Sequence, residues 1–246
     1  MISYILYIFA KIMSNPYFRF KKFTVWHDRC AMPVGTDGVL LGAWAELRCA
    51  SRILDVGTGS GLLALMAAQR NDSARVIGID VDSDSVSQAA GNVASSPFSN
   101  RIEILLEDVR RFRPPQPFDS IICNPPFYTE AVLPPDEGRS LARNTASLRF
   151  SELIESIAAL ISDQGVFNVI IPTQAESDFI SQCLMSRLYV QRLCHVKTVQ
   201  RKEAKRVMAT FSKSVCNNPS SEVLVLMDNE GRRTSQYIRL TSDFYL

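Results

Sequence analysis

The feature that most constrains the fold is a glycine-rich turn between a predicted strand and a predicted helix. Residues 53–56 predict a buried strand, residues 57–61 a tight turn, and Leu62–Arg70 a helix rich in leucine and alanine. Such a turn lets a ligand approach the backbone closely at the N-terminus of a helix. Its spacing is G-x-G-x-G, whereas a dinucleotide-binding turn has G-x-G-x-x-G. This spacing argues against NAD or FAD and suits S-adenosyl-L-methionine, whose methionine moiety would lie along the turn.

Acidic residues follow the next two predicted strands. Arg75–Asp80 predicts a strand that ends in a carboxylate, and Asp80 is placed to accept hydrogen bonds from the two hydroxyls of a ribose. Residues 101–108 predict a third strand. Asp108 is placed to accept from an adenine amino group, with the Val109 N–H beside the ring. Taken singly, each acid is also compatible with a helix N-cap or a solvated turn.

A fourth predicted strand, in residues 118–127, ends in Asn124-Pro125-Pro126-Phe127. Proline has no N–H and restricts the residue before it, so the Pro125 carbonyl and the Asn124 side-chain oxygen form two convergent acceptors. Such a pair suits a planar amino group, because accepting its hydrogens draws the nitrogen lone pair out of conjugation in the transition state. Phe127 would offer a stacking face to the ring that carries the amine. The alternative is a proline turn with Phe127 in the core.

The glycine turn, the two acids and the proline motif all follow strands, and ligands in an open α/β sheet bind at the carboxyl ends of the strands. The chain continues with alternating helices and strands and ends in an antiparallel pair, which predicts an α/β fold. Thr36 or Asp37 is expected to cap a helix in residues 39–47, and Ser151 a helix in residues 151–161. The remaining predictions are a helix in residues 85–94, a strand in 166–171, a helix in 175–187, strands in 189–199 and 206–211, and a last strand in 223–227.

Size and composition describe one large globular domain. With 246 residues, of which 46% are hydrophobic, the chain can bury a full core. We expect residues 15–246 to form this domain, residues 15–50 to cover its cofactor and substrate site, and residues 1–14 to be an extension. Residues 1–13 are too short for a membrane span and lack a secretory pattern, so they are expected to be an interfacial or packing helix, or an over-extended reading frame. A cytoplasmic monomer without stable membrane association is expected.

Cysteine and histidine usage argues against a metal site. The six cysteines are widely spaced with no C-x-x-C, and the two histidines, His27 and His195, form no ligand pattern. Free thiols in a reducing compartment, and no metal, are expected.

Two basic segments flank the core motifs. Residues 15–29 interleave aromatic and cationic side chains, which suits stacked nucleotides and phosphates but is equally compatible with a solvated β-hairpin. A second basic cluster lies in residues 197–206, and residues 128–148 form a long polar segment of the kind that is usually functional. Because the net charge is only +2, affinity for nucleic acid must come from such local patches. The candidate RNA-binding residues are Lys21, Lys22, His27, Arg29, Arg143, Lys202 and Lys205.

At these residues the chain resembles the class I S-adenosylmethionine-dependent methyltransferases that carry N-P-P-[FY], and within them the tRNA(Val) adenine-N6 methyltransferases, which modify the adenosine 3′ of the anticodon. The resemblance rests on FKKFTVWHDRCAMPVGTDGVLLGAW, ILDVGTGSG, ICNPPFY, ARNTASLRFSELIE and LTSDFYL, and it extends over nearly the whole chain from Asn15. Pro33 departs from the pattern, which has a basic residue there.

The resemblance implies a Rossmann-like, mostly parallel seven-stranded sheet in the order 3-2-1-4-5-7-6, with the last strand antiparallel and helices on both faces. It implies cofactor contacts from Thr36, Asp37, Asp55, Gly57, Gly59, Gly61, Asp80, Asp108, Val109 and Asn124. It implies catalytic contacts to a target base from Asn124, Pro125, Pro126 and Phe127, and tRNA as the partner.

Other functions remain open at this point. An N-P-P-[FY] enzyme could methylate an amino group of ribosomal RNA, DNA adenine or a protein glutamine. Glutamine methylators usually have tyrosine at the last motif position and a helical domain ahead of the core, and DNA methylators need a target-recognition domain. A non-catalytic protein that binds S-adenosylmethionine and RNA is the alternative from a different class, although pure binding needs no paired amine acceptors. A dehydrogenase is disfavoured by the glycine spacing.

Overall fold

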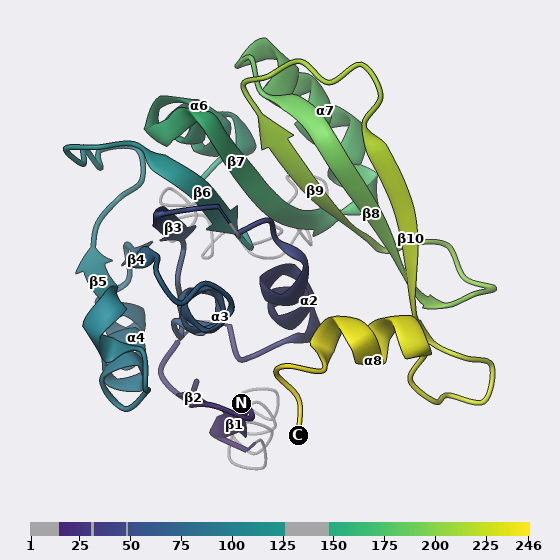
Figure 1. The fold of residues 1–246 in the computed structure, drawn as a ribbon, viewed down its shortest axis with the longest axis horizontal. Coiled ribbons are helices and arrows are strands. Elements are labelled where there is room, and N and C mark those ends of the chain that lie inside the picture. Colours follow the sequence, from purple (N-terminus) through teal and green to yellow (C-terminus); the bar gives the residue numbers. More distant parts are fainter. Residues whose placement is uncertain (1–14, 31, 48, 126–147) are drawn as a thin grey trace, which may run out of the picture.

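The computed structural model describes residues 15–30, 32–47, 49–125 and 148–246, and a mostly parallel sheet lies at its centre (Figure 1). This sheet has eight strands in the order β10-β8-β9-β7-β6-β3-β4-β5. The strands are β3 (Arg52–Val56), β4 (Arg75–Asp80), β5 (Ile102–Leu106), β6 (Phe118–Cys123), β7 (Ile161–Pro172), β8 (Tyr189–Val199), β9 (Arg206–Ser212) and β10 (Ser220–Met227).

Strand direction reproduces the expected fold class and adds one strand. From the β5 edge the first seven strands follow the order expected above, and β9 runs antiparallel to both β7 and β8. The eighth strand, β10, extends the sheet parallel to β8, so the expectation of seven strands was one short. Its sequence had predicted a strand but not its place at the sheet edge.

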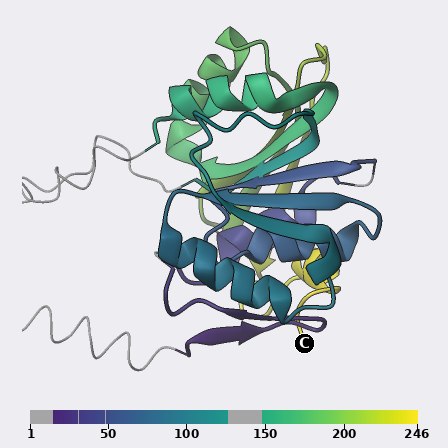
Figure 2. The ribbon, with the colours of Figure 1, turned by 90° about the vertical axis from the view of Figure 1, so that its left-hand side faces the viewer.

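Helices cover both faces of the sheet, as Figures 1 and 2 show. One face carries α2 (Thr36–Trp44), α3 (Leu62–Arg70), α4 (Ser83–Ala94) and α8 (Ser235–Thr241). The other face carries α6 (Phe150–Leu160) and α7 (Glu176–Met185), and the 3₁₀ turns η1 (Ser99–Arg101) and η2 (Thr173–Ala175) complete the described elements. Among these elements, no helix has the length and apolar character needed to cross a membrane.

Two predicted helix caps were wrong. Helix α2 begins at Thr36 after Gly35, so neither Thr36 nor Asp37 caps it. Helix α6 begins one residue before Ser151, and the Glu152 side chain accepts a hydrogen bond from the Arg149 N–H at 3.0 Å. A carboxylate in the first turn satisfies a backbone N–H and complements the helix dipole, which gives the same capping effect from another position.

The N-terminal part of the described chain forms a hairpin of β1 (Tyr17–Arg19) and β2 (Thr24–Trp26). A β-hairpin was one of the two interpretations of residues 15–29 in the sequence analysis. Phe20 is buried, and the Lys21 N–H donates to the Phe244 carbonyl at 2.9 Å. The hairpin therefore packs against the C-terminal residues, with α4 alongside (Figure 2).

Candidate active site

Three of the predicted site segments meet at one edge of the sheet. Val56 lies opposite Ile79 in β4 and opposite Cys123 in β6, and all three strands are parallel. The glycine turn, Asp80 and Asn124 continue directly from these positions. The structure thus brings together the residues that the sequence predicted to bind one ligand at the carboxyl ends of the strands.

The three glycines of the turn have different roles. All adopt positive φ, at 69° for Gly57, 53° for Gly59 and 80° for Gly61. A Cβ on Gly57 would meet nothing within 4 Å, and one on Gly59 would meet only the Gly57 carbonyl at 4.0 Å. A Cβ on Gly61 would lie 3.2 Å from the Ala89 Cβ of α4. Gly57 and Gly59 therefore leave the backbone open to a ligand, whereas Gly61 allows close helix packing.

Asp80 holds the turn in place from the next strand. Its Oδ2 accepts the Gly59 N–H at 2.9 Å, and its Oδ1 accepts the Asp82 N–H at 3.0 Å. A carboxylate oxygen has more than one acceptor site, so both oxygens keep the capacity to accept from ribose hydroxyls. Asp80 therefore orients the turn and remains the candidate for the ribose contact.

Asp55 is a fully buried carboxyl group beneath the turn. Its Oδ2 accepts from the Thr58 hydroxyl at 2.6 Å and from the Ala64 N–H at 3.1 Å. Its Oδ1 is buried without a hydrogen-bond partner. Burial disfavours the charged form and raises the pKa of Asp55 to about 7, although the two hydrogen bonds oppose this shift.

The raised pKa of Asp55 predicts a pH-dependent stability. The folded protein keeps a proton that the unfolded chain releases above its ordinary pKa of 3.8, so this stabilisation is present at low pH and lost as pH rises through about 7. Relative to an Asp55→Asn variant, we expect the free energy of unfolding to fall by about 1 kcal/mol per pH unit between about pH 4 and pH 7 and to level off above that range. Chemical denaturation of both proteins measures this; parallel pH profiles would contradict it.

Asn124 presents a buried acceptor to the same edge. Its Oδ1 is buried and has no hydrogen-bond partner, while Pro125 beside it is buried. Helix α2 passes close by: a Cβ on Gly38 would lie 3.9 Å from Asn124 Nδ2 and 3.0 Å from Leu62. An unpaired buried acceptor is costly to a folded protein, so this oxygen is suited to a donor from a ligand. Pro126 and Phe127 lie outside the described residues, and their roles stay predictions.

The comparisons with known proteins agree with this geometry. A model of the family "Methyltransferase small domain" matches residues 35–148. A tRNA1(Val) (adenine(37)-N6)-methyltransferase from Phocaeicola vulgatus is 44% identical over 234 residues, covering 95% of this chain and 99% of the relative. A protein of the same description from Pseudoalteromonas translucida is 39% identical, covering 93% and 98%. The chain belongs to the tRNA1(Val) (adenine(37)-N6)-methyltransferase family.

The fold of this family member is that of the class I methyltransferases, and its cofactor is S-adenosylmethionine. The crystal structure of a predicted O-methyltransferase from Agrobacterium tumefaciens superimposes with a TM-score of 0.67 at 22% identity, covering 85% of this chain and 96% of that chain. The open backbone at Gly57 and Gly59 and the unpaired Asn124 Oδ1 fit the cofactor and the target base. Within the described ranges, no group of three potential ligands is placed to hold a metal ion.

Asp108 is engaged by a residue that the sequence analysis missed. Arg110 Nη2 donates to Asp108 Oδ2 at 2.6 Å, and its Nε donates to Asp108 Oδ1 at 2.9 Å. Arg110 Nη1 also donates to Glu152 Oε1 of α6 at 3.3 Å. The guanidinium hydrogen bonds lower the pKa of Asp108, so it stays ionised. An adenine contact to Asp108, beside the buried Val109, would have to share the carboxylate with Arg110.

Asp37 also has a protein partner. Its Oδ2 accepts from Arg206 Nε at 2.7 Å, which joins the start of α2 to the start of β9. Arg206 pairs with Pro172 at the carboxyl end of β7, so this ion pair lies at the same edge of the sheet as Asn124. For Thr36 and Asp37, a cofactor contact stays a prediction, and the structure adds a role in joining two elements.

The described candidate RNA-binding residues of this family member lie in three places: the connection from β8 to β9, the hairpin turn, and the residues that follow β2. Lys202 and Lys205 are exposed in the connection from β8 to β9, which lies at the carboxyl edge of the sheet because Arg206 is opposite Pro172. Lys21 and Lys22 lie at the hairpin turn, where Lys21 Nζ donates to the Ser242 carbonyl at 2.6 Å.

The hairpin turn is at the far end of the molecule from the glycine turn. Gln69, near the end of α3, donates to the Asp243 carbonyl at 2.8 Å, and α3 runs away from the glycine turn to reach it. His27 Nε2 lies 3.0 Å from the Asn15 carbonyl, and the Arg29 N–H donates to Gln88 Oε1 at 3.0 Å. Arg143 lies outside the described residues.

Proposed function

We propose that this protein transfers the methyl group of S-adenosylmethionine to N6 of adenosine 37, the nucleotide 3′ of the anticodon, in tRNA1(Val). The relatives at 39% and 44% identity carry that activity in their names. The observation that carries the proposal is the buried, unpartnered Oδ1 of Asn124 at the edge of the sheet where the glycine turn opens. That oxygen is suited to accept a hydrogen of the adenine amino group.

The protein's contribution to the reaction is alignment and electrostatics. S-adenosylmethionine, when bound, supplies an activated methyl group. The Asn124 Oδ1 and the Pro125 carbonyl would accept the two amino hydrogens and draw the nitrogen lone pair out of the ring. The nitrogen would then accept the methyl group first and release one proton to solvent afterwards. Asp55 and Asp80 would hold the turn and the cofactor in position, and burial of the site would limit water.

Nucleoside mass spectrometry tests this function. Total tRNA and purified tRNA(Val) from cells with and without the protein would be digested and compared, and N6-methyladenosine should be present only with the protein. If the modification is found only in ribosomal RNA, DNA or protein glutamine, the proposed tRNA substrate is wrong and the modified molecule is the substrate. Binding of tRNA with no transfer of labelled methyl would contradict catalysis.

The basic connection between β8 and β9 is the proposed surface for the tRNA backbone near the site. Replacing both Lys202 and Lys205 with glutamine should weaken tRNA binding roughly 10-fold and reduce the salt slope of log K by about 1.5, since each phosphate contact contributes about 0.7–0.9. Cofactor affinity should not change. Binding titrations across salt concentrations measure both effects.

The comparison variant is the double replacement of Lys21 and Lys22, which removes the same charge at the hairpin turn. If both double variants bind like wild type, the two clusters are solvated surfaces. If only the Lys21 and Lys22 variant loses affinity, the tRNA lies across the hairpin turn instead. We also propose that the protein acts in the cytoplasm, where a tRNA substrate is found, and that it acts as a monomer. Sedimentation analysis with and without tRNA would test the oligomeric state.

A further inference from the structure

The hairpin of β1 and β2 presents two exposed aromatic rings on its outer face. The side chains alternate, so Phe18 and Val25 face the protein while Tyr17, Arg19 and Trp26 share the other face. Trp26 is 48% exposed and Tyr17 is 38% exposed. Leaving large aromatic surface in water brings no gain in folding stability, so this face is a candidate binding surface.

The two rings are held in a fixed arrangement. Tyr17 lies directly opposite Trp26 in the hairpin, and their ring centroids are 5.0 Å apart at an angle of 49°. The Trp26 N–H donates to Asn92 Oδ1 at 2.9 Å, and Asn92 Nδ2 donates to the Trp26 carbonyl at 2.8 Å. The backbone beneath the rings is therefore anchored to α4, so little conformational entropy would be lost when a partner binds them.

These contacts also connect the aromatic pair to the cofactor turn. Asn92 Nδ2 donates to the Ser60 carbonyl at 2.9 Å, so one side chain touches both the Trp26 backbone and the glycine turn. The next residues follow α4, where Gln88 Oε1 accepts the Arg29 and Cys30 N–H groups at 3.0 and 2.9 Å. The Trp26 end of the hairpin is thus its end nearer the active site.

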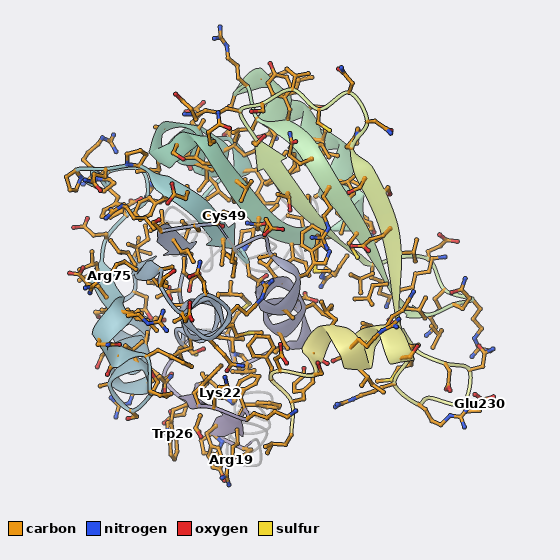
Figure 3. All side chains as sticks on the ribbon, in the orientation of Figure 1. Arg19, Lys22, Trp26, Cys49, Arg75 and Glu230 are labelled. Carbon is orange, nitrogen blue, oxygen red and sulfur yellow. The ribbon has the colours of Figure 1, made fainter. Side chains whose placement is uncertain are left out.

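The charge around the rings is positive. Arg19 and Arg29 are exposed, and within the described part of the chain no ion pair involves them. Figure 3 shows Arg19 and Trp26 extending outward at the same end of the molecule. Asp28, two residues after Trp26, accepts from Gln88 Nε2 at 2.6 Å. A small aromatic face edged by cations matches unpaired nucleotides, which offer bases for stacking and phosphates for the cations.

We propose that Tyr17 and Trp26 form a stacking platform for an unpaired nucleotide of the RNA substrate, with Arg19 and Arg29 contacting the adjoining phosphates. This rests on the proposed function, because an enzyme that modifies a base in a loop must extrude it and leaves neighbouring bases without a stacking partner. The platform would accept such a neighbour and hold the loop open.

Binding of tRNA by Trp26 variants tests the platform. Trp26→Ala should weaken binding of tRNA(Val) at least about fivefold, as expected for loss of one base stack. Trp26→Phe should retain most of the affinity because a ring remains. The matched control is Leu184→Ala, which truncates a 57% exposed apolar side chain on α7 and should bind like wild type. Unchanged binding by Trp26→Ala would overturn the proposal.

Salt dependence separates stacking from charge. Trp26→Ala should lower affinity without altering the salt slope, whereas Arg19→Gln should reduce the slope by about 0.7–0.9 for one phosphate. An RNA duplex of the same length without unpaired nucleotides should bind the wild type and Trp26→Ala equally. If Trp26→Ala weakens duplex binding to the same extent, the ring contacts the backbone and no base stacks on it.

Fluorescence gives a direct readout at the proposed site. The chain has two tryptophans, and Trp44 is only 4% exposed, so quenching by acrylamide reports mainly on Trp26. Saturating tRNA(Val) should protect this quenchable fraction, and the fully paired duplex should not. Protection by neither RNA, while wild-type enzyme still methylates tRNA, would refute the platform and leave the proposed function intact. Absence of methylation by the wild type would instead refute the function.

Discussion

Replacing Asn124 with alanine is expected to lower the single-turnover rate of methyl transfer about 10²–10³-fold, by analogy with removal of one oxyanion-hole donor. The variant loses the buried Oδ1, which has no hydrogen-bond partner and is the proposed acceptor for the amino group. Its interaction strengthens as the nitrogen becomes tetrahedral, so the loss should appear in the rate and not in substrate affinity. Rapid-quench assays with labelled methyl donor at saturating cofactor and tRNA measure the chemical step.

Two controls accompany this variant. Calorimetry should find nearly unchanged cofactor affinity, because the proposed role of Asn124 Oδ1 is toward the target base. Thermal unfolding should show little loss of stability, because the oxygen that is removed has no hydrogen-bond partner. Asn124→Asp keeps an acceptor at the same position and should fall between wild type and alanine. An Asn124→Ala enzyme that reacts at full rate would end the proposed mechanism.

Replacing Asp80 with alanine should weaken cofactor binding by about 1.5–3 kcal/mol, the range for hydrogen bonds to a charged group, or roughly 10- to 150-fold. Two effects combine in this loss. The variant lacks the acceptor proposed for the ribose, and it releases the Gly59 N–H that Asp80 holds at 2.9 Å. Isothermal titration with S-adenosylmethionine measures the change.

The matched control for Asp80 is Asp84→Ala, which removes an exposed carboxylate from the first turn of α4 with the same change in charge. It should bind the cofactor like wild type. If both variants lose affinity equally, the loss comes from net charge near the turn. If Asp80→Ala binds normally, Asp80 neither contacts the ribose nor organises the turn.

The part of the site that could be predicted from sequence is the part encoded by local pattern. The bounds of α3 and β4 were predicted to the residue, because a glycine turn and an acidic strand end mark them in the chain itself. These signals place Gly57, Gly59 and Asp80 at the end of adjacent strands without any long-range information. Asn124 could be predicted for the same reason, since it directly follows a buried strand.

Features that depend on distant contacts could not be predicted in this way. The partner of Asp108 is set by the turn after β5 and by Glu152, 42 residues away from Arg110. Helix α8 has only seven residues and depends on its Thr234 cap and on packing of Tyr237 in the core beside α2. Its local helical pattern is too short to stand out, so tertiary contact decides its structure.

The attachment of the hairpin to α4 has a consequence for protein engineering. Gln88 and Asn92 hold residues 26–30 through backbone groups, so the hairpin is not an independent module. A hairpin transplanted from a relative would still form these hydrogen bonds, because they involve its backbone and not its side chains. The only requirement is that α4 of the recipient protein carries the two side-chain amides. We therefore expect that the proposed RNA specificity of the hairpin could be exchanged by grafting, and that α4 decides which hairpins the protein can hold.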